Sequence, residues 1–400
     1  MTEHNTPTGP LRRGSVRALA PLSVVAIVAT GAALAPQLAS AAPTLPPISA
    51  QNLLVKAAQS KVTAYSGTVA LTTNLGLPAL PDLAGGANPV SLLGGTHTLQ
   101  VAADGPAKQR IALLDTMSEY DLVRNGTQVW LYDSSQNSVE HATLSGHDPA
   151  ERSKQDSKQR PDDGLTGQSL TPQQAAQRLL AAVTPSTKVT VDGTRSVAGR
   201  AAYTLALTPK EKGSLIGRVE IAVDAQNGAP LRVAVYPVGS GTAAFELGFT
   251  SVSFSTPAAP QFDFKAPKGA TVTELDGHSA QSKQNNPLAG AELAPQVLGQ
   301  DWLSVVELHG VDLNALIGTA RSAGGSGGKR HNDTGLFNGD TSSYLDALVG
   351  AGKPVSGAFG SGKLYTTNFL SVLVTNDGRL FAGSVTPSVL EADAAAQGTK

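Results

Sequence analysis

The stretch VEIAVDAQNGAPLRVAVY, residues 219–236, constrains the fold more than any other part of the sequence. Two segments that alternate apolar and polar residues flank Asn227-Gly228, a pair typical of β-hairpin turns. A two-residue turn would place Val223 opposite Arg232 and mix the two faces. A three-residue loop gives three aliphatic pairs instead: Val223 with Leu231, Ile221 with Val233, and Val219 with Val235. We predict this loop, with Gly228 left-handed as a bulge residue, because the hairpin then has one wholly apolar face.

Similar alternation recurs along the chain and predicts an antiparallel sheet. The expected strands include residues 67–72, 98–101, 109–113, 189–191, 203–207 and 245–249. A further hairpin, EYDLVRNGTQVWLYD, is expected to turn at Asn125-Gly126. The pairs expected for it are Leu122 with Val129 and Tyr120 with Leu131. Short helices are expected after the capping residue Ser49, after Thr171 and around Tyr344. Runs of strands with a few helices indicate an α+β fold rather than alternating βαβ units.

Composition excludes several classes of function. The 400 residues carry a net charge of −1, so no basic excess exists to neutralise phosphates, and a nucleic-acid partner is not expected. Hydrophobic residues make up 40% of the chain, enough for a packed core, but only 4% are aromatic, so a binding surface would be mainly aliphatic. The chain contains no cysteine and therefore has no disulfide, thiolate metal site or cysteine nucleophile.

The N-terminus, residues 1–41, has the three-part layout of a secretory signal peptide. Three arginines precede an apolar run from about Leu19 to Leu38, and small residues follow. We expect cleavage near Ala41 and an exported protein, either held in the cell envelope or secreted. An uncleaved membrane anchor is the alternative, which the prolines within the run disfavour.

Two glycine-rich segments match the letters of catalytic motifs but lack their context. GAFGSGK, Gly357–Lys363, fits a phosphate-binding loop, yet Leu364 stands where a hydroxyl would bind magnesium, so we predict bends between strands. GGSGG, Gly324–Gly328, fits a serine-hydrolase elbow but lies in a low-complexity run. The seven histidines show no metal-ligand spacing, and His97 suits an exposed or hydrogen-bonded role in a strand. We therefore expect no enzyme and no nucleotide, cofactor or metal site.

Composition shifts divide the chain into four segments. Residues 1–41 are the signal peptide, 42–273 the strand-rich domain, 274–300 a polar linker and 301–400 a small C-terminal α+β domain or extension. Two strands are expected in the last segment, around VTNDGRL.

The order of these pieces resembles the bacterial lipoprotein-carrier (LolA-like) family from about Ser49 to Thr273. The most telling pieces are an acid-turn-Gly-x-Pro-Leu-x-Val hairpin at Asp224–Val233 and a Phe-Lys-x-Pro-Lys-Gly segment at Phe264–Gly269. The residues after Asp301 distinguish the chain from the short carriers. In this it resembles members from bacteria that lack an ordinary outer membrane.

The resemblance implies an incomplete antiparallel β-barrel, or half-barrel, with short helices as a lid over an apolar cavity for acyl chains. Such relatives bind lipid or lipidated protein, either as carriers in outer membrane lipoprotein sorting or as envelope sensors. RseB/MucB-type regulators of the same family bind a membrane-bound anti-sigma factor, and this role is the alternative for the chain. The predicted cavity residues are Val219, Ile221, Val223, Leu231, Val233, Val235, Tyr203, Leu205, Leu207, Leu122, Val129 and Leu131. For each of them, plain core packing is the competing interpretation.

Overall fold

The computed structural model covers most of the strand-rich segments predicted above. It describes residues 42–76, 91–92, 94–144, 184–275, 295–310 and 350–398. The predicted signal peptide, the loop at 145–170, the helices after Thr171 and around Tyr344, and the Gly324–Gly328 run lie outside the described residues. Within the described ranges, no helix is both long and apolar enough to span a membrane.

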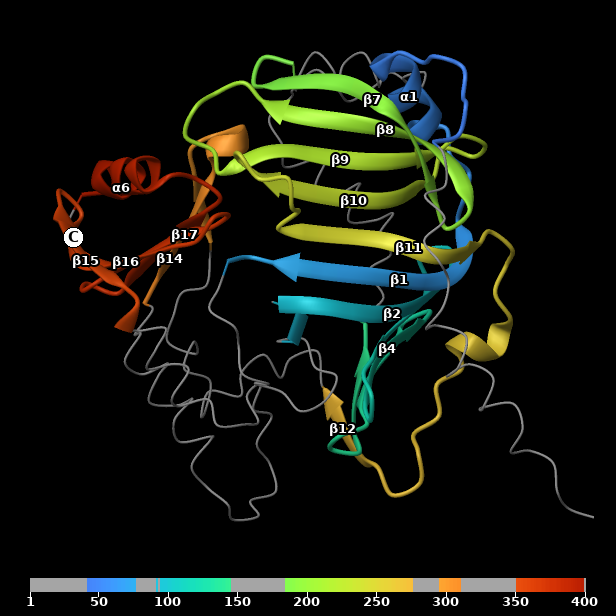
Figure 1. Ribbon diagram of the computed structural model, residues 1–400. Helices are drawn as coiled ribbons and strands as arrows, with labels where there is room; N and C mark the ends of the chain where they lie inside the picture. The colour runs from blue at the N-terminus through green and yellow to red at the C-terminus, as the bar shows by residue number, and fades with distance from the viewer. Residues whose placement is uncertain are drawn as a thin grey trace, which may run out of the picture. The chain divides into compact units, whose positions relative to one another are not determined.

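The first part of the chain forms one mixed sheet of twelve strands. They are β1 Ala64–Asn74, β2 Gly94–Asp104, β3 Lys108–Leu114, β4 Glu119–Asn125, β5 Gln128–Asp133, β6 Ser138–Thr143, β7 Thr187–Val197, β8 Arg200–Pro209, β9 Ile216–Asp224, β10 Pro230–Pro237, β11 Phe245–Ser253 and β12 Thr271–Leu275. Their order in the sheet is β12-β6-β5-β4-β3-β2-β1-β11-β10-β9-β8-β7. Because β12 and β7 are the two edges, the sheet is not closed. Figure 1 shows it curling, with β4 lying steeply to the direction of β1 and β11.

The sheet differs from the prediction of a purely antiparallel one, because β12 pairs with β6 in parallel. The chain leaves β11 and passes through the 3-10 helix η2, Ala259–Phe262, which packs on β3 and β4. It then reaches the edge beside β6 and runs in the same direction as that strand. The segment around Pro267 and Gly269, where the strand pattern breaks, therefore leads into a further strand. The described fold is mostly β with few helices.

Helix α1, Ala50–Ala58, begins where the sequence predicts. The Ser49 side chain accepts a hydrogen bond from the backbone N–H of Asn52 at 3.2 Å, which satisfies one of the free donors of the first turn. Leu53 and Val55 are buried. The helix packs against β7 and β8 (Figure 1).

The hairpin at residues 219–236 has most of its predicted register. Two predicted pairs are confirmed, Ile221 with Val233 and Val219 with Val235. Gly228 is left-handed, with φ +76°. The pairing of Val223 with Leu231 is wrong: Val223 faces Pro230, and Leu231 occupies an irregularity between Pro230 and Arg232.

Local hydrogen bonds in the turn explain this difference. Asp224 accepts hydrogen bonds from the backbone N–H groups of Gln226 and Asn227 at 2.8 and 2.9 Å. The Asn227 side chain accepts one from the backbone N–H of Ala229 at 3.0 Å. These side-chain contacts hold a turn longer than three residues. Leu231, the extra residue on the return strand β10, is then accommodated as a bulge.

The loop of the hairpin at residues 119–133 begins one residue later than predicted, which shifts the pairing register by two residues. Asn125 pairs with Gln128, so the loop is Gly126-Thr127 rather than Asn125-Gly126. Gly126 has φ +63° and Thr127 has no positive φ, as in a type II′ turn with glycine first. The observed pairs are Leu122 with Leu131 and Tyr120 with Asp133. A shift by two residues keeps the same side chains on each face, so the apolar side of the hairpin is preserved.

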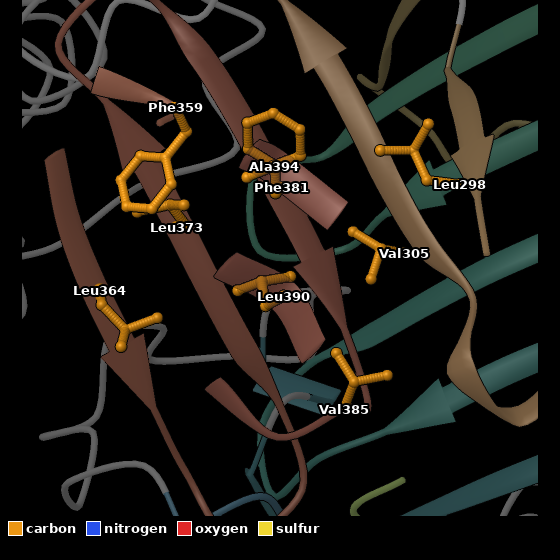
Figure 2. Close-up of a cluster of buried hydrophobic side chains, with 9 residues drawn as sticks. All are labelled: Leu298, Val305, Phe359, Leu364, Leu373, Phe381, Val385, Leu390 and Ala394. Atoms are coloured by element: carbon orange, nitrogen blue, oxygen red, sulfur yellow. The ribbon is translucent and has the colours of Figure 1, made fainter. Parts of the chain in front are cut away.

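A second, antiparallel sheet of six strands lies in the C-terminal segment. Its elements are β13 Gln296–Leu298, the 3-10 helix η3 Asp301–Leu303, β14 Val305–His309, β15 Lys353–Gly357, β16 Gly360–Thr366, β17 Ser371–Thr375, β18 Arg379–Gly383 and helix α6 Pro387–Ala396. GAFGSGK is the β15–β16 hairpin, with Gly357 opposite Gly360, and VTNDGRL joins β17 to β18, both as predicted. Figure 2 shows the core of this part, in which Leu390 and Ala394 of α6 join side chains such as Leu373 and Phe381 from the strands.

Candidate functional site

One side of the twelve-stranded sheet carries aliphatic side chains that face each other across neighbouring strands. We call this side the apolar face. Its long row crosses β8, β9, β10, β11 and β1 through Leu205, Ile221, Val233, Leu247 and Leu71, each opposite the next. Its short row crosses β2 to β5 through Val101, Ile111, Leu122 and Leu131. On β2, His97 faces Leu71 and Val101 faces Ile111. Because side chains alternate along a strand, residues four positions apart point to the same side, so both rows lie on one side of the sheet.

The apolar face is only partly covered. Leu247 is 36% exposed, Leu122 39% and Ile111 45%. All three are members of the rows, with aliphatic neighbours on adjacent strands. Single exposed aliphatic residues are ordinary, but neighbours aligned over several strands form a continuous apolar surface.

Helix α1 covers the part of the apolar face that lies over β7 to β9. Leu53, fully buried, packs in one cluster with Tyr203, Leu205 and Val223. The Tyr203 hydroxyl donates a hydrogen bond to the backbone carbonyl of Pro46 at 2.8 Å, which holds the segment before the helix. The helix thus covers one end of the long row and leaves Leu247 exposed.

The opposite side of the same strands is polar and closed. Glu220 lies between Val219 and Ile221 and therefore points away from the apolar face. Its side chain is only 6% exposed. It accepts hydrogen bonds from Arg195 at 3.1 Å, Arg218 at 2.9 Å, Arg232 at 3.3 Å and the Tyr236 hydroxyl at 3.3 Å. A buried carboxylate is tolerated only with such partners.

Aromatic packing closes the same polar side over the other half of the sheet. Trp130 points to this side, since it is opposite Val123. It stacks on His141 with ring centroids 3.6 Å apart and on Phe264 at 5.5 Å. Phe262 of η2 is almost fully buried nearby. The polar side is therefore covered over β8 to β10 and over β4 to β6, while β2 between them carries exposed residues such as Gln100. The apolar side is partly open.

Two carboxylates of the polar side, Glu220 and Asp224, are held in their charged form. Burial by itself raises the pKa of Glu220, but hydrogen bonds from Arg218 and Arg232 and the charge of Arg195 outweigh it, and the pKa lies below the usual range. Burial also raises the pKa of Asp224. The hydrogen bond from Arg200 and two backbone N–H groups outweigh it, so that this pKa is lowered as well.

These lowered pKa values predict acid sensitivity. A carboxyl group whose pKa is lower in the folded than in the unfolded state stabilises the fold above its unfolded pKa, about 4. That stabilisation is lost as the pH falls through the folded pKa. We expect the free energy of unfolding, measured by urea titration, to be nearly constant from pH 7 to about pH 5 and to fall below about pH 4. A free energy that rises below pH 4 would contradict the prediction.

The predicted cavity residues lie in two places on the sheet. Those on β8 to β10 are neighbours, and Val219 and Val235 pair beside the long row. Leu122, Val129 and Leu131 are on β4 and β5, with β11, β1, β2 and β3 between them and the first group. Leu231 packs with Val197, Ala202 and Ala222 in a separate cluster. Sequence reasoning did not select Leu71, Ile111 and Leu247, although each lies in a segment predicted as a strand.

The described residues form no candidate metal-binding group. Among the described ranges, no three or more His, Asp or Glu side chains could jointly hold a metal ion. His97 is in β2 and its Nε2 lies 2.7 Å from the carbonyl oxygen of Gly94, in agreement with the expected hydrogen-bonded role.

Comparison with known proteins yields similarity at the level of structure. No protein-family model matches the chain, and no curated protein matches it in sequence. The chain is similar to the structure of the Pseudomonas aeruginosa MucA/MucB complex at 14% identity, over 86% of this chain and 95% of that one, with a TM-score of 0.41. A structure of MucB alone is similar at 15% identity, over 86% of this chain and 96% of that one, with a TM-score of 0.37. A LolA superfamily protein of Nitrosomonas europaea is similar at 16% identity, over 54% of this chain and 98% of that one, with a TM-score of 0.22. At these identities the similarity concerns the fold alone.

Proposed function

We propose that the chain is an exported, non-enzymatic protein that binds the acyl chains of lipid or lipidated protein on the apolar face, as a carrier or envelope sensor. Residues 42–273 would form the ligand-binding domain, joined by a linker at 274–300 to a C-terminal domain at 301–400. The observation that carries the proposal is the exposure of Leu247, Ile111 and Leu122 within two aligned aliphatic rows. Covering such side chains with an apolar ligand is favourable by about 25 cal/mol per Å².

The dimensions of the long row suit a hydrocarbon chain. Five neighbouring strands spaced about 4.8 Å apart give a row about 19 Å long, whose β8 end lies under α1. Its five members are all aliphatic and carry no charge. Such a surface has no hydrogen-bonding group that would orient a polar substrate, but it matches a long acyl chain.

Substituting the exposed member of the long row tests this proposal. We expect the wild-type protein to bind a fluorescent fatty acid at one site, measured by fluorescence titration. Leu247→Asp should weaken binding roughly tenfold or more, because the ligand would desolvate a carboxylate. The matched control is Gln100→Asp, which places the same side chain at an exposed position on the other side of β2.

Circular dichroism shows whether both variants are folded. A folded Leu247→Asp protein with wild-type affinity would overturn the assignment of the site. If the wild-type protein binds no acyl ligand, the carrier function itself fails. The better candidate is then a regulator that binds a membrane-bound protein such as an anti-sigma factor.

A further inference from the structure

Two polar side chains interrupt the apolar face at one end of the long row. Thr73 follows Val69 and Leu71 on the buried side of β1 and is only 6% exposed. Within the described part of the chain, its hydroxyl oxygen has no hydrogen-bond partner. A buried hydroxyl without a partner is unfavourable and rare in folded proteins. Its position beside the long row therefore indicates a group that a ligand would satisfy.

The second polar side chain is His97. It faces Leu71 across β1 and β2, so the long row ends on its imidazole. Nε2 lies 2.7 Å from the carbonyl oxygen of Gly94, and because a carbonyl only accepts, Nε2 carries a proton. In the neutral ring Nδ1 is then an acceptor, and in the charged ring it is a donor.

Thr73 and His97 are close to each other across the two strands. Thr73 faces Gly95, two residues before His97, which makes the two side chains diagonal neighbours on the same face. Gly95 has φ +84° and no side chain, and a Cβ there would lie 3.8 Å from His97 Nε2, so the imidazole reaches towards the position opposite Thr73.

We propose that Thr73 and His97 form the subsite for the carboxyl end of the acyl ligand, an inference that rests on the proposed function. The Thr73 hydroxyl donates a hydrogen bond to the carboxyl carbonyl oxygen. His97 Nδ1 accepts the proton of the neutral acid, or donates to the carboxylate when the imidazole is charged. The hydrocarbon chain then runs from β1 towards β8 along the long row.

The test compares dodecanoic acid with its methyl ester by calorimetric titration of the purified full chain. The ester keeps the carbonyl that Thr73 would bind but has neither a proton for His97 nor a negative charge. The wild-type protein should bind the acid more tightly than the ester. Thr73→Val should weaken binding of both ligands about threefold to tenfold, the loss of one hydrogen bond. His97→Phe should remove the preference for the acid.

The matched control is Thr72→Val, one residue away on the opposite side of β1, where the hydroxyl lies 3.1 Å from that of Thr96. It should change neither affinity. Stability gives an independent readout, because valine nearly matches threonine in shape. The urea midpoint of Thr73→Val should equal or exceed that of the wild type, since no hydrogen bond is lost.

Two results would overturn the subsite while leaving the proposed function intact. One is wild-type affinity of Thr73→Val for both ligands. The other is a clearly lower urea midpoint for this variant, which would show that the hydroxyl is bonded within the protein. If the wild-type protein binds neither ligand, the proposed function fails and the subsite fails with it.

Discussion

Glu220→Gln is expected to lower the free energy of unfolding by about 3 kcal/mol, since removing one partner from a buried charge network leaves the remaining buried charge only partly compensated. Glu220 is the common acceptor of Arg195, Arg218 and Arg232. The Arg232 side chain is only 11% exposed, so it cannot recover full hydration when the Glu220 carboxylate is lost, although its ion pair with Glu246 at 2.6 Å remains. Arg195 and Arg218 are more exposed, which keeps the effect at the lower end of the range for buried pairs.

Urea unfolding at pH 7 measures this change, and a surface pair gives the control. Asp104 and Lys108 form an ion pair at 3.2 Å with both side chains substantially exposed. Asp104→Asn removes it by the same chemical replacement and should cost less than about 1 kcal/mol. Equal losses of unfolding free energy in the two variants would show that the burial of Glu220 does not determine its contribution to stability.

The local parts of the fold could be predicted from sequence because their causes are local. Ser49 caps α1 through its own side chain, and the alternation around Ile221 sets which side chains share a face. The two hairpins show the limit of this reasoning. Asn-Gly marks a turn, but Asp224 lengthens one turn and Gly126 begins the other one residue later. Each of these choices depends on a few hydrogen bonds that the pattern of apolar residues does not encode.

The candidate site could be predicted only in part, because it depends on pairing between distant strands. The long row places Leu71 beside Leu247, which are far apart in the sequence. The alternation of apolar and polar residues in β1 and β11 shows that each strand has an apolar side, but it does not show that the two strands are neighbours. The parallel strand β12 was missed for a similar reason: its five residues are all exposed, and its two aliphatic residues, Val272 and Leu275, do not alternate regularly with polar ones.

The contact between α1 and the β9–β10 turn leads to the second large expected effect. Gly228→Ala should destabilise the protein by about 2–3 kcal/mol, for two reasons that add. At φ +76° an alanine is strained by about 1 kcal/mol or more. In addition, its Cβ would lie 2.4 Å from the backbone carbonyl oxygen of Lys56, which belongs to α1. A backbone atom cannot rotate away, so the helix itself must move from its position over the sheet.

Gly126→Ala separates the two causes. Gly126 has a similar φ of +63°, but a Cβ there would meet nothing within 4 Å. This control should therefore show the conformational cost alone, about 1 kcal/mol in urea unfolding. Hydrogen exchange adds a local readout: the amides of Leu53 to Ala57 should exchange faster in Gly228→Ala and stay unchanged in Gly126→Ala. Equal destabilisation of both variants, with α1 equally protected, would mean that the turn does not hold the helix. The cover over this end of the long row would then depend only on apolar packing around Leu53 and on the bond from Tyr203 to Pro46.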